Sequence, residues 1–128
     1  MIFLDKSQLI SWHARLIREH GGTPEIRDEA ALESALIAAQ NRSHYETADV
    51  IGCAAAYAYH LTNAHAFLDG NKRIAAVATE VFLETNGIEL AASESELLRL
   101  YVGIAAGRIN RDAVEATLRG LVKKTNAR

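Results

Sequence analysis

His65-Ala66-Phe67-Leu68-Asp69-Gly70-Asn71-Lys72-Arg73 is the most informative stretch of this 128-residue chain. It places an imidazole, a carboxylate, a glycine and two cations directly before a segment whose apolar residues recur at helical spacing, namely Ile74, Val77, Ala78, Val81 and Phe82. Backbone N–H groups at the start of a helix have no intrahelical acceptor, and they bind phosphate. An imidazole beside bound phosphate suggests phosphoryl or nucleotidyl transfer.

The first half of the stretch supplies a base and a carboxylate. Because imidazole titrates close to neutral pH, His65 could accept a proton from an incoming hydroxyl. Asp69 is a short carboxylate suited to a hydrated Mg²⁺ that bridges phosphate oxygens. Phe67 alternates with these polar positions, so we expect it to point into the core. The ordinary alternative is a structural histidine and an aspartate that caps the helix.

The second half supplies groups that bind phosphate. Gly70 lets the backbone approach a ligand, and Asn71 offers an amide donor. Lys72 offers the compact charge of an ammonium group, and Arg73 offers a planar guanidinium that can bind two phosphate oxygens. The ordinary alternative is a turn followed by two solvated cations. Cations in a first helical turn oppose the macrodipole, however, and an anion between them and the helix end would remove this conflict.

Composition favours one helical domain. About half of the residues are apolar, many of them alanine, with 6% aromatic residues and one proline. The net charge of −2 gives no excess of positive charge that would indicate binding to duplex nucleic acid or to an anionic membrane. Cys53 is the only cysteine, which excludes an intramolecular disulfide. There is no signal peptide pattern or run long enough to span a bilayer, so we expect a cytoplasmic protein without a membrane partner.

Capping residues and periodicity predict six helices in a single domain spanning 1–128. Their expected ranges are about 5–20, 28–39, 48–63, 70–86, 93–107 and 110–122. The third is apolar on nearly every face, which is typical of a buried central helix. Residues 40–47 are polar and aperiodic, so we predict a loop that carries Arg42, His44 and Tyr45. We expect the tail, 123–128, to fray.

The nine-residue stretch resembles the signature His-x-Phe-x-[Asp/Glu]-[Gly/Ala]-Asn-x-Arg of the Fic/Doc superfamily. Further likeness to its Doc (death-on-curing) toxin branch extends over nearly the whole chain, at Gly21-Gly22, Tyr45-Glu46, Asn86-Gly87 and Val102-Gly103-x-Ala105-x-Gly107. The resemblance implies an all-α fold, a compact six-helix Fic/Doc-like bundle with a short flap loop.

The resemblance also implies a role for each residue of the signature. His65 would act as base towards a protein hydroxyl, and Asp69 would bind Mg²⁺. The backbone at Gly70 and the side chains of Asn71, Lys72 and Arg73 would hold the phosphates of ATP, the co-substrate.

Lys72 stands where adenylyl-transferring relatives carry glycine, and Ala76 stands where they carry a second arginine. The same lysine marks the Doc branch. This implies a kinase that moves the γ-phosphate of ATP to a threonine of elongation factor Tu and so blocks translation. A lysine would fill space and add charge where glycine leaves room for the other phosphates.

Two alternatives stay open, a Fic-type adenylyltransferase and a catalytically silent module that binds antitoxin or nucleotide. A zinc hydrolase is disfavoured, since His60 and His65 lie five residues apart.

Regulation by a second protein is a further implication. The inhibitory motif of Fic enzymes has only an incomplete match, at 85–90, so inhibition would come from a separate antitoxin of a type II toxin–antitoxin system. The predicted loop 40–47 matches the family's flap, which aligns a target peptide by strand addition. Arg42, His44 and Tyr45 are therefore candidate contacts for the target or antitoxin. The ordinary alternative is an exposed loop with Tyr45 anchored in the core.

Overall fold

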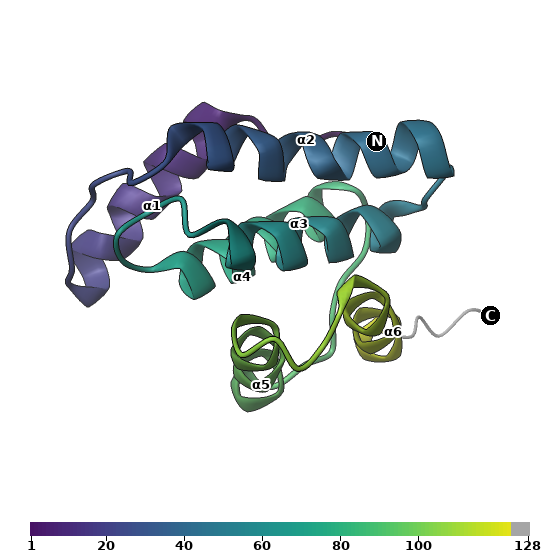
Figure 1. Cartoon of the computed structure of the whole chain (residues 1–128). Coiled ribbons are helices and arrows are strands. Elements are labelled where there is room, and N and C mark those ends of the chain that lie inside the picture. The colour runs from purple at the N-terminus through teal and green to yellow at the C-terminus, as the bar shows by residue number, and fades with distance from the viewer. Residues whose placement is uncertain (124–128) are drawn as a thin grey trace.

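Six α-helices make up most of the computed structural model, which describes residues 1–123 (Figure 1). They are α1 (Lys6–His20), α2 (Glu29–Glu46), α3 (Val50–Ala64), α4 (Asn71–Thr85), α5 (Glu94–Ala105) and α6 (Arg111–Leu121). Within residues 1–123, β pairing is limited to two isolated antiparallel bridges, Ile26 with Phe67 and Leu90 with Val122. The predicted all-α fold of six helices is confirmed. Apart from Lys123, the tail predicted to fray lies outside the described residues.

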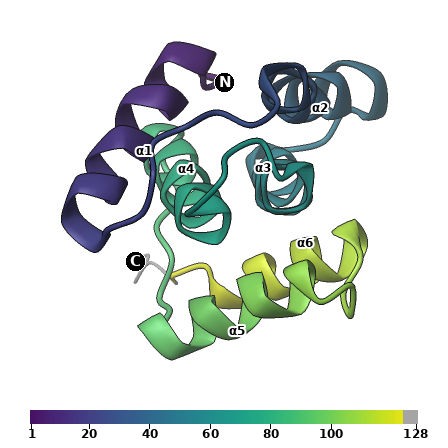
Figure 2. The ribbon, with the colours of Figure 1, turned by 60° about the vertical axis from the view of Figure 1, so that its left-hand side comes forward.

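Helix α3 is the centre of the molecule. It packs against α2, α4, α5 and α6, and Figure 2 shows it between α2 and α4, with α5 and α6 beneath them. Every residue from 52 to 58 is buried, and most of them are alanine, glycine or cysteine. Such small side chains let neighbouring helices approach closely on several sides. The expectation of a buried central helix is confirmed, and Cys53 is one of its buried core residues.

Side chains cap the starts of five helices. In each, the side-chain oxygen accepts a hydrogen bond from a backbone N–H of the first turn, and the caps are Asp5, Asp28, Asp49, Ser93 and Asn110. Two of these starts, at Asp5 and Ser93, form complete capping boxes with Gln8 and Glu96. Local sequence therefore locates the helix starts well, and only α4 begins differently.

The predicted loop at 40–47 is wrong, because α2 continues to Glu46 and ends where Thr47 adopts a left-handed conformation with φ 52°. The physical reason is Arg42. Its guanidinium donates to the carbonyl oxygen of Gly52 at 2.8 Å and pairs with the Glu115 carboxylate at 2.7 Å. These partners lie on α3 and α6. They stabilise the last turns of α2, although the local sequence shows no apolar periodicity there.

Candidate active site

The segment between α3 and α4, residues 65–70, is called here the site loop, and its two ends adopt left-handed backbone conformations. His65 ends α3 with φ 49° and ψ 41°, and Gly70 begins α4 with φ 78° and ψ 18°. A positive φ is uncommon for a residue other than glycine, and it is often found at functional sites. Phe67 is buried as expected, whereas His65 and Asp69 remain exposed. The loop is thus anchored by its middle and presents its polar residues to solvent.

The segment that joins α1 to α2 holds the site loop along one side. Ile26 forms the antiparallel bridge with Phe67, and the Leu68 N–H donates to the carbonyl oxygen of Glu25 at 3.2 Å. The Ala66 carbonyl oxygen accepts from the Arg27 N–H at 2.7 Å. Figure 2 shows the two connections running beside each other. The extended backbone next to the site is therefore this segment, not residues 40–47, where the family's flap was expected.

Asn71 has a structural role that the sequence did not indicate. Its Oδ1 accepts from the Phe67 N–H at 3.1 Å, and its Nδ2 donates to the Phe67 carbonyl oxygen at 2.8 Å. The side chain thus closes the loop onto the first turn of α4. The amide donor that we expected to face phosphate is used within the loop, which leaves the Asn71 backbone N–H for a ligand.

The N-terminus of α4 has no side-chain cap within the described residues. Gly70 occupies the cap position and has no side chain to donate or accept a hydrogen bond. Asp69, the ordinary candidate for a cap, instead accepts the Thr23 N–H at its Oδ2 atom at 3.0 Å. First-turn N–H groups and the positive end of the helix dipole together favour an anion. This helix start is therefore suited to phosphate.

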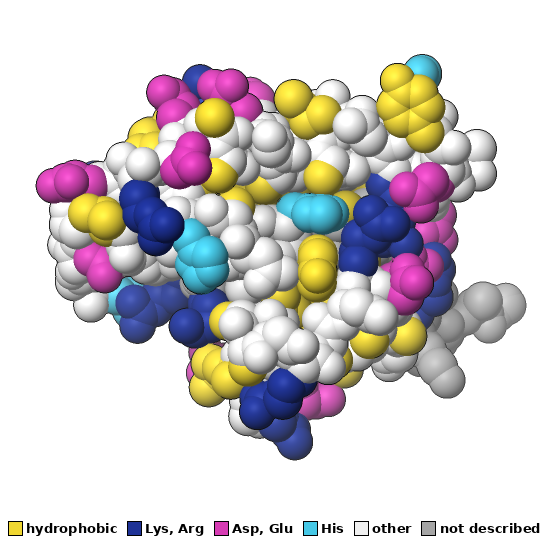
Figure 3. Space-filling model, in the orientation of Figure 1, with side chains coloured by type: hydrophobic (Ala, Val, Ile, Leu, Met, Phe, Trp, Pro, Cys, Tyr) yellow, Lys and Arg dark blue, Asp and Glu magenta, His cyan; other side chains and the backbone are white. Residues whose placement is uncertain are grey.

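One cavity collects the residues that the sequence selected. It has a volume of about 490 Å³ and is lined by Thr62, His65, Leu68, Asp69, Gly70, Asn71, Lys72, Arg73, Leu98 and Ala105. In Figure 3 several basic and histidine side chains lie at the left-hand end of the molecule, where Figure 1 shows the α3–α4 connection, while acidic side chains gather at the upper left, over the beginning of α2. A base, a carboxylate and two cations therefore surround a single hollow.

Sequence reasoning assigned no role to four residues of this cavity, Leu68 within the site loop and three outside it. Leu98 and Ala105 come from α5, and only the fold brings that helix to the site. Thr62 lies one turn before His65 on α3, buried, with no hydrogen-bond partner for its Oγ1 atom in the described structure. The three-residue spacing from His65 is the one signal that could have pointed to Thr62.

The residues present fit a magnesium ion that arrives with phosphate. No cluster of three or more histidine, cysteine or acidic side chains suited to a metal lies within residues 1–123. A zinc site needs at least three such ligands, whereas Mg²⁺ is commonly held by one carboxylate together with substrate phosphates and water. Asp69 lines the cavity and uses one of its two carboxylate oxygens for Thr23. Asp69 therefore matches a magnesium site, in which one carboxylate and the substrate phosphates hold the ion.

Arg42, His44 and Tyr45 lie elsewhere and do not line this cavity. Arg42 is buried between α2, α3 and α6, and its side chain is 8% exposed. Tyr45 is 77% exposed on the last turn of α2, so the alternative that it is anchored in the core is also wrong. The rings of His44 and Tyr45 contact each other edge to face at 4.8 Å.

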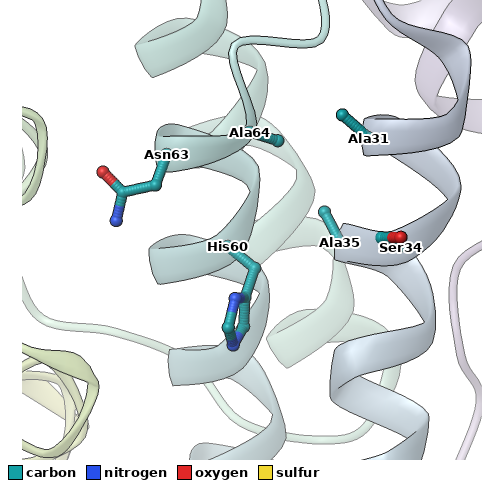
Figure 4. A pocket seen from close by; sticks show the side chains of 6 residues that line it. All are labelled: Ala31, Ser34, Ala35, His60, Asn63 and Ala64. Atoms are coloured by element: carbon teal, nitrogen blue, oxygen red, sulfur yellow. The ribbon is translucent and has the colours of Figure 1, made fainter.

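A second hollow, of about 260 Å³, lies between α2 and α3 (Figure 4). Three alanines from the two helices line it together with Ser34, His60 and Asn63. It offers no cation and no carboxylate, so it lacks the groups that a transfer reaction needs. Burial lowers the pKa of His60, and the nearby charges of Arg111 and Arg42 lower it further.

This shift predicts a pH dependence of stability. Because the His60 pKa is lower in the folded protein, the unfolded chain binds the proton first as the pH falls below about 6.5. Stability is then lost progressively on acidification below about pH 6.5. In urea titrations, His60→Gln is expected to show a smaller fall in unfolding free energy across this range than the unmodified protein. Equal losses would contradict the assignment.

No helix in the described part of the chain is long and apolar enough to cross a membrane.

The chain is similar to known proteins over most of its length. Residues 3–83 match the Fic/DOC family, and this range includes the entire site loop. The chain is also similar to "Protein kinase doc" of Escherichia phage P1, with 34% identity over 122 residues, covering 94% of this chain and 96% of that protein.

Proposed function

This chain belongs to the Fic/DOC family, and we propose that it is a Doc-like toxin and protein kinase that transfers the γ-phosphate of ATP to a threonine hydroxyl of elongation factor Tu. The observation that carries this proposal is the shared cavity. His65, Asp69, Lys72 and Arg73 line it together with the uncapped start of α4. Similarity over almost the full length of a protein named as a kinase supports the same reaction class.

His65 is the proposed catalytic base. It is exposed, lines the cavity and follows directly after α3, so an incoming hydroxyl can reach its imidazole. It would take the proton of the threonine hydroxyl as the oxygen attacks the γ-phosphorus atom. The bond from phosphorus to the bridging oxygen breaks, and ADP leaves with the electron pair.

The phosphates would lie at the start of α4. The backbone N–H groups of its first turn, together with Lys72 and Arg73, would stabilise the charge on the transferring phosphoryl group. Catalysis of this kind depends mainly on positioning and on charges fixed in advance. Two cations that oppose the helix dipole in the empty protein become favourable once an anion is bound between them and the helix end.

Asp69 would hold the magnesium ion of the nucleotide. Its Oδ2 atom accepts the Thr23 N–H, and the second oxygen of the same carboxylate accepts no hydrogen bond from the described residues of the chain. When bound, Mg²⁺ neutralises charge on the phosphate oxygens.

Lys72 favours phosphoryl transfer over adenylyl transfer. Its side chain is exposed on the first turn of α4, where it takes up room and places charge beside the phosphates. One turn further, Ala76 offers no second guanidinium.

Inhibition would come from a separate antitoxin, as in a type II toxin–antitoxin system in the cytoplasm. The incomplete inhibitory motif at 85–90 begins at the far end of α4, a 15-residue helix about 22 Å long. Asn86 there binds the backbone of Ile2 at 2.7 Å and 3.0 Å. This segment is thus committed to the N-terminus of the chain, far from the phosphates.

Labelled ATP separates the candidate reactions. The purified protein is incubated with elongation factor Tu, Mg²⁺ and ATP labelled at either the γ- or the α-phosphate. We expect label on the elongation factor only from γ-labelled ATP, at a threonine identified by mass spectrometry. Label from the α-position would establish adenylyl transfer instead. No label from either position would overturn the proposed target and favour a binding module or another substrate.

A further inference from the structure

His13 is a buried polar residue of α1 whose hydrogen bond reaches the site loop. It is 1% exposed, and its Nε2 atom lies 2.7 Å from the carbonyl oxygen of Asp69. A carbonyl oxygen can only accept, so Nε2 carries the proton and donates it. The bond joins α1 to the residue that carries the site's carboxylate.

The His13 ring also fixes the middle of the loop. It stacks on the Phe67 ring with a centroid separation of 3.7 Å and an angle of 15° between the planes. A Cβ atom added at Gly70 would lie 3.5 Å from both His13 Nε2 and Ile17 Cδ1. Helix α1 therefore forms the surface on which residues 67, 69 and 70 rest.

Asp69 is held at two points by α1 and the segment that follows it. His13 holds its carbonyl oxygen, and the Thr23 N–H holds its Oδ2 atom. Gly22 makes the second contact possible, because a Cβ at that position would come within 3.2 Å of the same oxygen. The direction of the Asp69 carboxylate and the start of α4 are consequently set by residues that do not line the cavity.

If His13 only filled space in the core, an apolar side chain would serve equally well at this position. An apolar side chain would leave the Asp69 carbonyl oxygen without its buried donor, and the loop would be free to relax towards solvent. We propose that His13 is a positioning residue for the transfer reaction: it holds Asp69 and Gly70 in the geometry in which the carboxylate and the first N–H groups of α4 face His65 across the cavity. This inference rests on the proposed kinase function.

Two substitutions separate positioning from packing. His13→Phe keeps a ring against Phe67 but removes the donor, whereas His13→Gln restores an N–H donor at a similar distance from the backbone. Loss of a residue that orients an active-site ligand typically reduces activity 10- to 100-fold. We expect His13→Phe to lower kcat by about this factor, with the KM for the protein substrate changed less than about twofold, and His13→Gln to recover most of the rate.

Leu9→Val is the matched control, since Leu9 is a fully buried residue one helical turn earlier on α1. It is expected to keep the kcat of the unmodified protein. A His13→Phe variant as active as this control would overturn the proposal. So would a His13→Gln variant that remains as slow as His13→Phe, because the donor would then not be the important group.

Hydrogen exchange tests the same inference without any substrate. The N–H groups of Thr23 and Leu68 are held by Asp69 and Glu25, so their exchange rates report the seating of the loop. They are expected to exchange at least about tenfold faster in His13→Phe than in Leu9→Val. Unchanged rates would overturn the positioning role even if the protein proves to be a kinase. Faster exchange in a protein that transfers no phosphate would support the positioning role and reject the proposed function.

Discussion

Replacing His65 with alanine is expected to lower the rate of phosphate transfer by two to four orders of magnitude, the usual contribution of a general base of about 10²- to 10⁴-fold. His65 is the sole histidine among the residues that line the cavity, and alanine cannot accept the hydroxyl proton. The groups proposed to bind phosphate belong to α4, and we expect them to stay in place. We therefore expect kcat to fall while nucleotide binding, measured by calorimetry, changes little.

The fold should survive this substitution, because His65 is exposed and makes no hydrogen bond that the core depends on. Its left-handed conformation is somewhat less favourable for alanine than for histidine, but the residue lies outside the helices, so circular dichroism should show unchanged helix content. His20→Ala is a suitable control, since this exposed histidine on the last turn of α1 does not line the cavity. Transfer that persists in His65→Ala, or is lost equally in His20→Ala, would rule out His65 as the base.

The parts of the site that the sequence predicts are those that are local in the chain. The site loop and the first turn of α4 span consecutive residues, so their side chains must share one neighbourhood however the rest of the chain folds. Helix starts are equally local, since each cap and its partner lie three residues apart, as with Asp28 and Ala31. For the same reason the buried position of Phe67 could be predicted from its alternation with polar neighbours.

The parts that the sequence could not predict depend on contacts between distant segments. Asn71 carries the expected amide, but only the folded loop shows that Phe67 uses both of its polar atoms. His13 and Leu98 are separated from the loop by many residues and reach it through α1 and α5. Arg42 is the clearest case, because a charged residue in a polar stretch indicates solvent exposure until its buried partners are known.

Those partners form an ion cluster that links α2, α3 and α6. Arg42 Nη1 donates to the Gly52 carbonyl oxygen, and Nη2 lies 2.7 Å from Glu115 and 3.6 Å from Asp112. Its Nε atom is buried without a hydrogen-bond partner. Glu115 has a second cation, Arg119, at 2.7 Å. The two members of the pair are unequal, since Glu115 has a second cation at 2.7 Å. The other carboxylates near Arg42 are more distant and belong to exposed side chains, Asp112 at 3.6 Å and Glu46 at 3.8 Å.

This inequality predicts that Glu115→Ala destabilises the fold more than Arg42→Met does. Removing the carboxylate leaves a guanidinium that is 8% exposed without its closest counter-charge, and breaking such a buried pair costs about 3 kcal/mol of unfolding free energy. Arg42→Met removes the buried charge itself and leaves Glu115 paired with Arg119, so we expect a loss nearer to about 1 kcal/mol. Asp112→Ala is the control: this carboxylate is 85% exposed, and surface pairs contribute about 1 kcal/mol or less.

Urea titrations of the three variants and of the double variant Arg42→Met/Glu115→Ala measure these differences. The double variant should be more stable than Glu115→Ala alone, because the unpaired charge is then gone; if it is less stable, burial of the Arg42 charge is not what makes Glu115 necessary.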